Sequence, residues 1–373
     1  MKKLIYYNSI DIFRNPINQK NLESIPGGKL FSMLFHIVGG NYVFYDRSNS
    51  IKIPLNYKLL PHLEIPKYKK IDISFSEICD MRSKELMKQA INTNRKIAIM
   101  YSGGIDSTMV VTSFFKNFPK TIIKDNILLL MNEFSIGENP NFYYNFISPY
   151  DIECIPSSKY INYIGSKKYI VISGEQSDQL YLPNFSLDYL RNRNINFLYN
   201  YVQDGPMIEL IDHFLPIYKD KNSAENLYFI WKKICDNAPI KIENNAMFLW
   251  WIIFATKWQS CYFRMIPFSN NVNKIEFEIG YTSFFNNDNF QLWSMNSMQN
   301  FNIDNFKDMK LESKKYIYNF NKDDEYLKDK DKFGSLNTPV RRKKLATMID
   351  EKMNIYNEYP TEEFINYDND FRK

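Results

Sequence analysis

The sequence predicts an α/β fold with a parallel sheet, and three observations support this prediction. Apolar runs within residues 96–100, 126–131 and 167–173 have the length and composition of buried strands. Segments with the apolar spacing of helices alternate with these runs, as in βαβ units. Glycines follow two of the runs, at residues 103–104 and at Gly174, where a strand would turn toward a helix.

The helices of this region carry local start signals. Ser74 would cap a helix, and the apolar residues at helical spacing behind it are Phe75, Ile78, Cys79, Leu86 and Ala90. Further helices are expected over 107–117 and over 139–147, where Pro140 suits a first turn.

The chain divides into three expected parts. Residues 1–72 combine short aromatic and aliphatic runs with turn signals, and they predict a small β-rich region that ends in a proline-punctuated linker. Residues 73–340 form the main domain, and beyond about residue 185 its pattern is mostly helical, including 245–263. Residues 341–373 are a highly charged C-terminal tail.

Composition excludes several classes of protein. The net charge of +5, from 47 basic and 42 acidic residues, is only a weak indication of a polyanionic partner, so a nucleic acid is not favoured. The N-terminus lacks the pattern of a signal peptide, and the longest apolar stretch, 247–255, is too short to span a bilayer. The isolated cysteines are Cys79, Cys154, Cys235 and Cys261, which favour buried, reduced thiols in a cytoplasmic protein.

The stretch SGGIDST, residues 102–108, has the composition of a phosphate-binding loop. Gly103 and Gly104 let backbone amides approach an anion, and the following helix adds its positive end. The hydroxyls that could donate to phosphate oxygens belong to Ser102, Ser107 and Thr108. Asp106 would repel phosphates unless a cation lay between them, so it implies Mg²⁺.

No lysine follows the glycines, so this is not a Walker loop. The stretch resembles the pyrophosphate loop, S-G-G-x-D-S, of the ATP pyrophosphatase superfamily. The resemblance implies a PP-loop (adenine nucleotide alpha hydrolase-like) fold that binds ATP and cleaves it between the α- and β-phosphates. It also implies that Met131, at the end of the next strand, lies against the adenine. The alternative is an ordinary glycine turn with a serine cap.

A second motif, ISGEQSDQLYL, covers residues 172–182. It is similar to the S-G-E-x-x-D-E segment of asparagine synthetase C-terminal domains. The matching positions are Ser173, Gly174, Glu175 and Asp178. Gln179 stands where that family has a glutamate, and the family's following glycine-rich piece is absent.

The two motifs together imply one site. A carboxylate that follows a parallel strand lies at the same sheet edge as the first loop, so Asp106 and Asp178 could hold Mg²⁺ on the pyrophosphate. Ser173 and Gly174 would then help to bind the nucleotide, and Glu175 would stabilise or deprotonate an incoming amine. A cluster of helix-capping carboxylates is the alternative.

Two weaker segments follow in the family's order. TKWQSCYFRMIPFSNN, 256–271, resembles a helix that ends in E-x-R-x-P-F-L-D, with Pro267 and Phe268 matching. An amphipathic helix ending at a proline is an equal alternative. The segment 314–336 resembles a stretch in which a lysine stabilises charge on the α-phosphate and pyrophosphate, and Lys330 or Lys332 would fill that role. A solvated run of charges is the alternative there.

The resemblance therefore implies an ATP-dependent, adenylate-forming amide ligase or amidotransferase of the asparagine synthetase type. Its cofactors would be ATP and Mg²⁺. Its partners would be a small-molecule or peptide carboxylate and an amine donor, and no membrane partner is expected. No cysteine precedes Cys79, so the nucleophile of the family's glutaminase domain is not expected, and ammonia would come from solution or from a partner protein. The alternatives are a PP-loop enzyme that modifies tRNA or a nucleobase, and a nucleotide-binding sensor without turnover.

Overall fold

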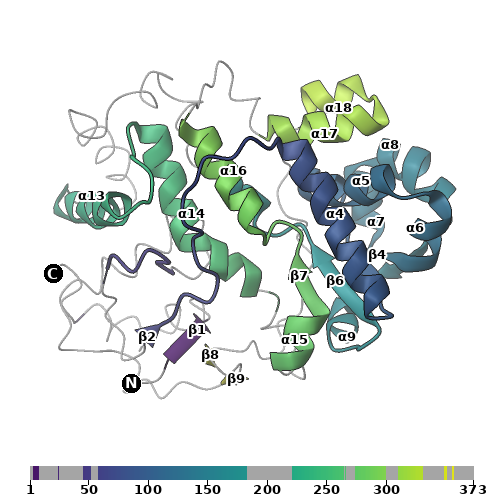
Figure 1. The fold of residues 1–373 in the computed structure, drawn as a ribbon, viewed down its shortest axis with the longest axis horizontal. Coiled ribbons are helices and arrows are strands. Elements are labelled where there is room, and N and C mark those ends of the chain that lie inside the picture. Colours follow the sequence, from purple (N-terminus) through teal and green to yellow (C-terminus); the bar gives the residue numbers. More distant parts are fainter. Residues whose placement is uncertain are drawn as a thin grey trace.

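The computed structural model describes residues 3–7, 24, 45–51, 58–182, 221–263, 265, 274–299, 310–330, 348–350 and 355–356 of the chain. The strands are β1 (Lys3–Tyr7), β2 (Lys58–Leu59), β3 (Lys96–Met100), β4 (Ile127–Met131), β5 (Glu153–Pro156), β6 (Tyr169–Ser173), β7 (Tyr281–Ser283), β8 (Met348–Asp350) and β9 (Ile355–Tyr356). The α-helices are α4 (Phe75–Asn92), α5 (Ile105–Asn117), α6 (Lys120–Asn126), α7 (Glu133–Glu138), α8 (Pro140–Phe142), α9 (Tyr160–Ile164), α13 (Lys221–Asp236), α14 (Asn245–Phe263), α15 (Lys274–Gly280), α16 (Asp288–Gln299), α17 (Leu311–Asn321) and α18 (Asp324–Asp329). A π-helix, η1 (Tyr143–Ile147), and the short 3₁₀ turns η2 (Ser148–Tyr150), η3 (Ser157–Lys159) and η4 (Ser177–Leu180) complete the set (Figure 1).

The main sheet is parallel, as the sequence predicts. Among the described residues it has five strands in the order β5-β4-β3-β6-β7, and each neighbouring pair is parallel. The chain moves outward from β3 through β4 to β5, and then returns to the opposite side of β3 with β6. The direction of winding therefore changes between β3 and β6, and the carboxyl ends of these two strands border the switch point. In open α/β sheets this crevice is where ligands bind.

The predicted elements around the switch point are confirmed, with small shifts at their ends. Strand β3 covers the predicted residues, and Ser74 caps α4 together with Glu77 in a capping box. Helix α5 begins at Ile105 rather than at residue 107, because Gly104 has extended backbone angles and serves as the N-cap. The helix expected over 139–147 is short α8, followed by the π-helix.

The C-terminal part contains strands that the sequence did not predict. Strand β7 lies in it and extends the main sheet beside β6. Strands β8 and β9 fall within the stretch expected to be a charged tail, and β8 pairs with β1 in a second sheet of order β2-β1-β8-β9. These strands have only two or three residues, too few for a period-two pattern to be visible in the sequence.

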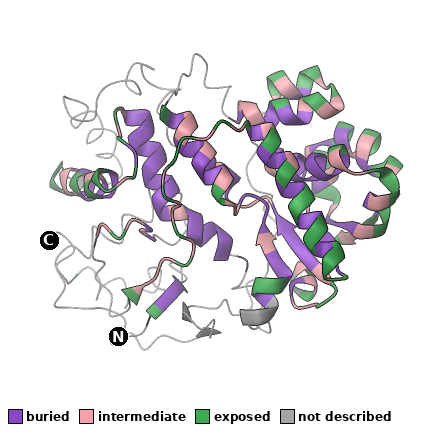
Figure 2. Ribbon diagram, in the orientation of Figure 1, coloured by how far each residue is buried: buried purple, intermediate pink, exposed green. Residues whose placement is uncertain are grey.

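Helix packing explains how the sheet is covered. Helices α4 and α5 contact β3, whereas α9 and α15 contact β6, and α17 packs against both α4 and α5. Helix α14 is buried along almost its whole length (Figure 2), and Trp250, Trp251 and Trp258 on it have no exposed surface. An all-round apolar helix of this kind forms the interior of a domain.

None of the described helices is both long enough and apolar enough to cross a bilayer. All four cysteines are free thiols, as expected. Three are buried, but Cys154 is exposed, which corrects the expectation for that residue. It lies on β5, which is one of the two edge strands of the main sheet among the described residues.

Candidate functional site

Two loops meet at the switch point of the sheet. The glycine loop, residues 102–104, joins β3 to α5, and the second loop, residues 174–178, follows β6. A Cβ atom on Gly174 would lie 3.2 Å from the backbone nitrogen of Ser107 and 3.2 Å from the carbonyl carbon of Asp106. This spacing is tight for a Cβ atom, so glycine allows the second loop to lie directly against the first turn of α5.

The glycine loop depends on the conformation of Gly103. Its φ is +78°, a region that residues with a side chain rarely adopt. A Cβ atom there would lie 2.3 Å from the carbonyl oxygen of Ser135 and 2.8 Å from Cβ of Glu138. The hydroxyl of Ser135 also donates to the carbonyl oxygen of Tyr101 at 2.9 Å. Helix α7 is therefore packed directly against the glycine loop.

The predicted hydroxyl donors lie together on this loop. The backbone N–H of Ser102 donates to Oγ of Ser107 at 3.1 Å, and the two hydroxyls lie 3.0 Å apart. Ser102 is exposed and Ser107 is buried. Thr108 is fully buried and donates from Oγ1 to the carbonyl oxygen of Gly103 at 3.3 Å. In this structure the Thr108 hydroxyl supports the loop from behind, whereas Ser102 is open to solvent.

The two predicted metal ligands converge on a lysine that the sequence analysis did not identify. Nζ of Lys310 lies 2.5 and 2.7 Å from the two carboxylate oxygens of Asp106 and 2.6 Å from Oδ1 of Asp178. The Lys310 side chain is 8% exposed, against 25% for Asp106 and 39% for Asp178. One ammonium thus joins the first turn of α5 to the second loop.

The charge of Lys310 is stabilised by this arrangement. Burial by itself would lower the pKa of the ammonium, but the two nearby carboxylates and their hydrogen bonds outweigh that effect and raise the pKa above its ordinary value. Lys310 therefore carries a positive charge throughout the physiological pH range. The residue is the N-cap of α17 in a left-handed conformation, with φ at 58°.

Strand β7, which was not predicted from the sequence, holds the second loop in place. Oγ of Ser283 donates to the carbonyl oxygen of Glu175, and the hydroxyls of Tyr281 and Ser173 lie 2.8 Å apart. The backbone N–H of Phe284 donates to the carbonyl oxygen of Ser173 at 2.9 Å. The hydrogen bond from Ser283 on β7 thus fixes the backbone at Glu175. Glu175 itself is partly exposed.

The predicted lysine, Lys330, is held near the glycine loop by an ion pair with Glu138. Its Nζ donates to Oε1 of Glu138 at 2.6 Å and to the carbonyl oxygen of the same residue at 2.9 Å. Glu138 is the residue whose Cβ lies beside Gly103. Lys332 falls outside the described residues.

Two further predictions concern Met131 and the third segment. Met131 ends β4, is buried, and precedes Asn132, the N-cap of α7. In the third segment, α14 covers the helix expected over 245–263, whereas Pro267 and Phe268 lie outside the described residues.

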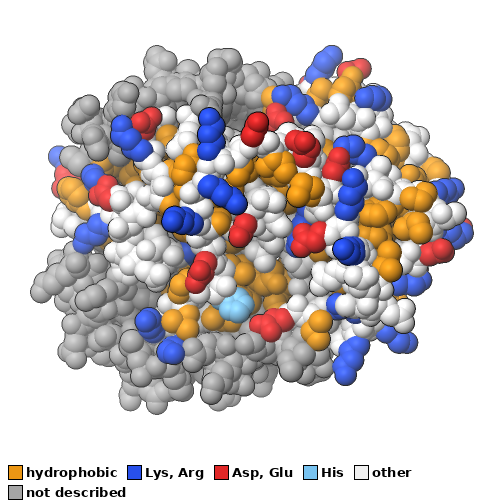
Figure 3. Space-filling model, viewed as in Figure 1, with side chains coloured by type: hydrophobic (Ala, Val, Ile, Leu, Met, Phe, Trp, Pro, Cys, Tyr) orange, Lys and Arg blue, Asp and Glu red, His pale blue; other side chains and the backbone are white. Residues whose placement is uncertain are grey.

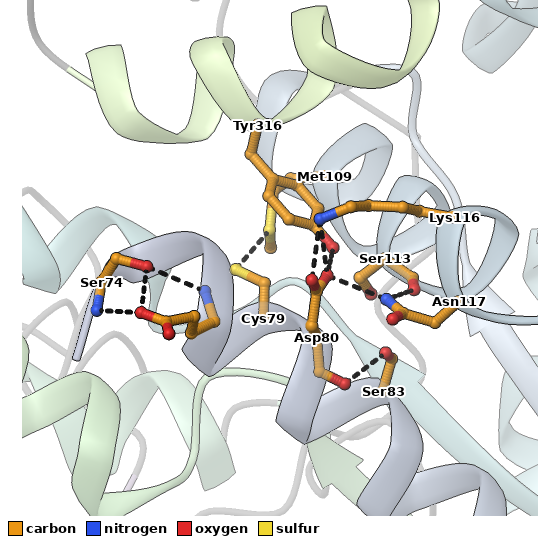
Figure 4. A network of polar contacts seen from close by, with 10 residues as sticks. Ser74, Cys79, Asp80, Ser83, Met109, Ser113, Lys116, Asn117 and Tyr316 are labelled. Atoms are coloured by element: carbon orange, nitrogen blue, oxygen red, sulfur yellow. Dashed lines mark hydrogen bonds and ion pairs between the residues drawn. The ribbon is translucent and has the colours of Figure 1, made fainter.

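A polar network joins α17 to α4 and α5 (Figure 4). The carboxylate of Asp80 on α4 accepts hydrogen bonds from the Tyr316 hydroxyl on α17 and from Lys116 and Asn117 on α5. Because Lys310 directly precedes α17, these contacts help to fix the helix that carries the bridging ammonium.

The described residues contain no group of three or more His, Cys, Asp or Glu side chains arranged to hold a metal ion. The convergent oxygen donors are those of Asp106 and Asp178. No protein-family model, curated protein or solved structure matches this chain.

Proposed function

We propose that this protein is an ATP-dependent, adenylate-forming amide ligase or amidotransferase that resembles the synthetase domain of asparagine synthetase. The observation that carries the proposal is the meeting of two loops at the switch point of a parallel sheet, with Asp106 and Asp178 directed to one cation. A helix N-terminus, two glycines and a buried lysine at the same place are suited to the phosphates of a nucleotide.

Mg²⁺ fits the donors of this site. Magnesium in nucleotide sites is held by one or two carboxylates together with phosphate oxygens, and Asp106 and Asp178 supply the carboxylates. In this structure the ammonium of Lys310 occupies the point where they converge. When bound, Mg²⁺ would neutralise charge on the pyrophosphate.

The proposed reaction has two steps. A substrate carboxylate oxygen attacks the α-phosphorus of ATP, and the bond from that phosphorus to the bridging oxygen breaks, releasing pyrophosphate. The nitrogen of an amine then attacks the activated carbonyl carbon, AMP leaves, and Glu175 accepts a proton from the amine. The amides at the start of α5, together with Lys310 and Lys330, stabilise the negative charge that develops on the phosphates.

The first alternative, modification of a nucleic acid, receives no support from the face drawn in Figure 3. Lysine and arginine side chains there alternate with aspartate and glutamate, and no broad basic patch is visible among the described residues. The second alternative, a nucleotide sensor without turnover, is favoured by Gln179, which is buried and stands at a position where the family has a carboxylate.

The test is release of AMP and pyrophosphate from ATP with Mg²⁺, together with calorimetric binding of Mg-ATP. Asp106→Asn is expected to lower the release of pyrophosphate by about a hundredfold, because it removes one of the two carboxylates that would hold Mg²⁺ at the reacting phosphates. Asp72→Asn, at an exposed position, is the control and should behave as the wild type. A wild type that binds no Mg-ATP refutes the proposal. Binding without pyrophosphate release, across a panel of carboxylates and amines, favours the sensor.

A further inference from the structure

We propose that Glu138 is the positioning residue for Lys330, an inference that rests on the function proposed above. The pair lies beside the glycine loop and is largely withdrawn from solvent, with side-chain exposures of 9% for Lys330 and 16% for Glu138. Nζ of Lys330 makes two contacts to one residue, the carboxylate at 2.6 Å and the carbonyl oxygen at 2.9 Å. Two acceptors on one residue restrict the ammonium more than a single surface contact does.

The physical need for a partner follows from the chemistry of lysine. Its side chain has a long flexible stem, and a buried ammonium without a partner is strongly disfavoured. Lys330 is the C-cap of α18, a short helix, so its backbone alone leaves the position of Nζ open. The carboxylate of Glu138 both compensates the charge and selects one position for it.

Glu138 is itself fixed relative to the glycine loop. Helix α7 begins at a capping box formed by Asn132 and Ser135. The Ser135 hydroxyl is bonded to the backbone of Tyr101, and Gly103 leaves no room for a side chain between the loop and α7. The glycine loop thus fixes the position of α7, which carries Glu138, and Glu138 in turn fixes Nζ of Lys330.

The role differs from that of Asp106 and Asp178. Those two carboxylates hold Lys310 and lie on the first turn of α5 and on the second loop, whereas Glu138 lies on α7 and has no assigned part in the chemistry. Its proposed action is through Lys330 alone. Its removal should therefore change where Lys330 lies and how well it meets the phosphates.

The experiment measures acetylation of Lys330 by an amine-selective acetylating reagent, read by mass spectrometry, and binding of Mg-ATP by calorimetry. Glu138→Gln is expected to raise the acetylation rate of Lys330 about tenfold and to weaken Mg-ATP binding about tenfold, because a charge-assisted contact is lost. Glu138→Asp keeps the carboxylate and should give intermediate values for both. Glu133→Gln, an exposed position on the same helix, is the control and should leave both unchanged.

The possible outcomes separate the inference from the proposed function. The positioning role is refuted if Glu138→Gln leaves Lys330 acetylation unchanged, or if acetylation rises while Mg-ATP binds as well as before or more tightly. Wild type that binds Mg-ATP, with binding lost in Asp106→Asn, supports the function regardless of the result at Glu138. If Glu138→Gln does not fold, Lys330→Gln and Glu138→Asp take its place, and each should weaken Mg-ATP binding.

Discussion

Lys310 joins two acidic side chains, one from the first turn of α5 and one from the second loop, and this has consequences for both charge and ligand binding. An ammonium has three N–H donors, and here they meet carboxylate oxygens of Asp106 and Asp178. A buried charge is tolerated when such partners are present. Without a nucleotide, Lys310 compensates the negative charge of the two loops. Under the proposed function, the same ammonium would donate to a phosphate of the bound nucleotide, and Asp106 and Asp178 would then be available to hold Mg²⁺.

Replacement of Lys310 by methionine tests this at the scale of one residue. Lys310→Met keeps the apolar stem and removes the charge, so Mg-ATP is expected to bind about tenfold more weakly, since a charge-assisted contact is lost. Lys315→Met is the matched control, because Lys315 is half-exposed on the same helix and pairs with Glu312 on the surface. Calorimetric titration with Mg-ATP measures both variants.

Mg-ATP binding by Lys310→Met that is not weakened would show that Lys310 does not help to bind the nucleotide. If Lys310→Met binds Mg-ATP as tightly as the wild type, the ammonium only fills the space between the carboxylates in the absence of ligand. Tighter binding would show that the lysine competes with Mg²⁺.

At the scale of elements, the position of α17 depends on the network around Asp80. Burial by itself raises the pKa of the Asp80 carboxyl, but hydrogen bonds from Lys116, Tyr316 and Asn117 outweigh it, and the pKa is lowered. A group with a lowered pKa in the folded state contributes stability above its unfolded pKa, which is about 4 for aspartate, and loses it as the pH falls. The network should therefore weaken in acid.

Asp80→Asn is expected to lower the free energy of unfolding at neutral pH by about 1 kcal/mol, a modest value because solvent reaches the carboxylate. The difference from the wild type should shrink as the pH falls through the lowered pKa. Urea unfolding at about pH 7 and about pH 3 measures it. Asp151→Asn is the control, because Asp151 forms an exposed pair with Lys124 and its loss should cost almost nothing. A difference that stays constant with pH would contradict the assignment of this stability to the Asp80 carboxylate.

The sequence could predict those elements whose signals are local. Strand β3, the cap at Ser74 and the turn at Gly103 depend on residues within a few positions of one another. Lys310 could not be predicted, because its partners lie far away in the chain. The neighbouring residues in the sequence are also charged, so nothing distinguishes this lysine from a surface residue. Glu138 was missed for the same reason, since its link to Lys330 exists only once α7 and α18 have packed.

At the scale of the whole molecule, Gln259 connects distant parts of the chain. It is fully buried on α14, and its amide makes four hydrogen bonds to the backbone. Oε1 accepts from the N–H groups of His62 and Leu63 at 2.8 and 3.0 Å. Nε2 donates to the carbonyl oxygens of Ile5 and Leu60 at 2.8 and 3.0 Å. One side chain thus fixes β1 and the segment after β2 against α14.

Gln259→Leu should therefore loosen the N-terminal part, because leucine has a similar volume but leaves four backbone groups without their partner. We expect the free energy of unfolding to fall by about 2–4 kcal/mol, the cost of leaving buried polar groups unpaired. Urea unfolding measures the loss, and faster trypsin cleavage at the exposed Lys67 and Lys69 would locate it. Gln89→Leu makes the same change at an exposed position of α4 and should leave both measurements unchanged. Equal cleavage rates in the Gln259→Leu variant and the wild type would mean that the N-terminal segments are held by other contacts, such as those of Arg47 to the carbonyl oxygens of Leu63 and Phe254.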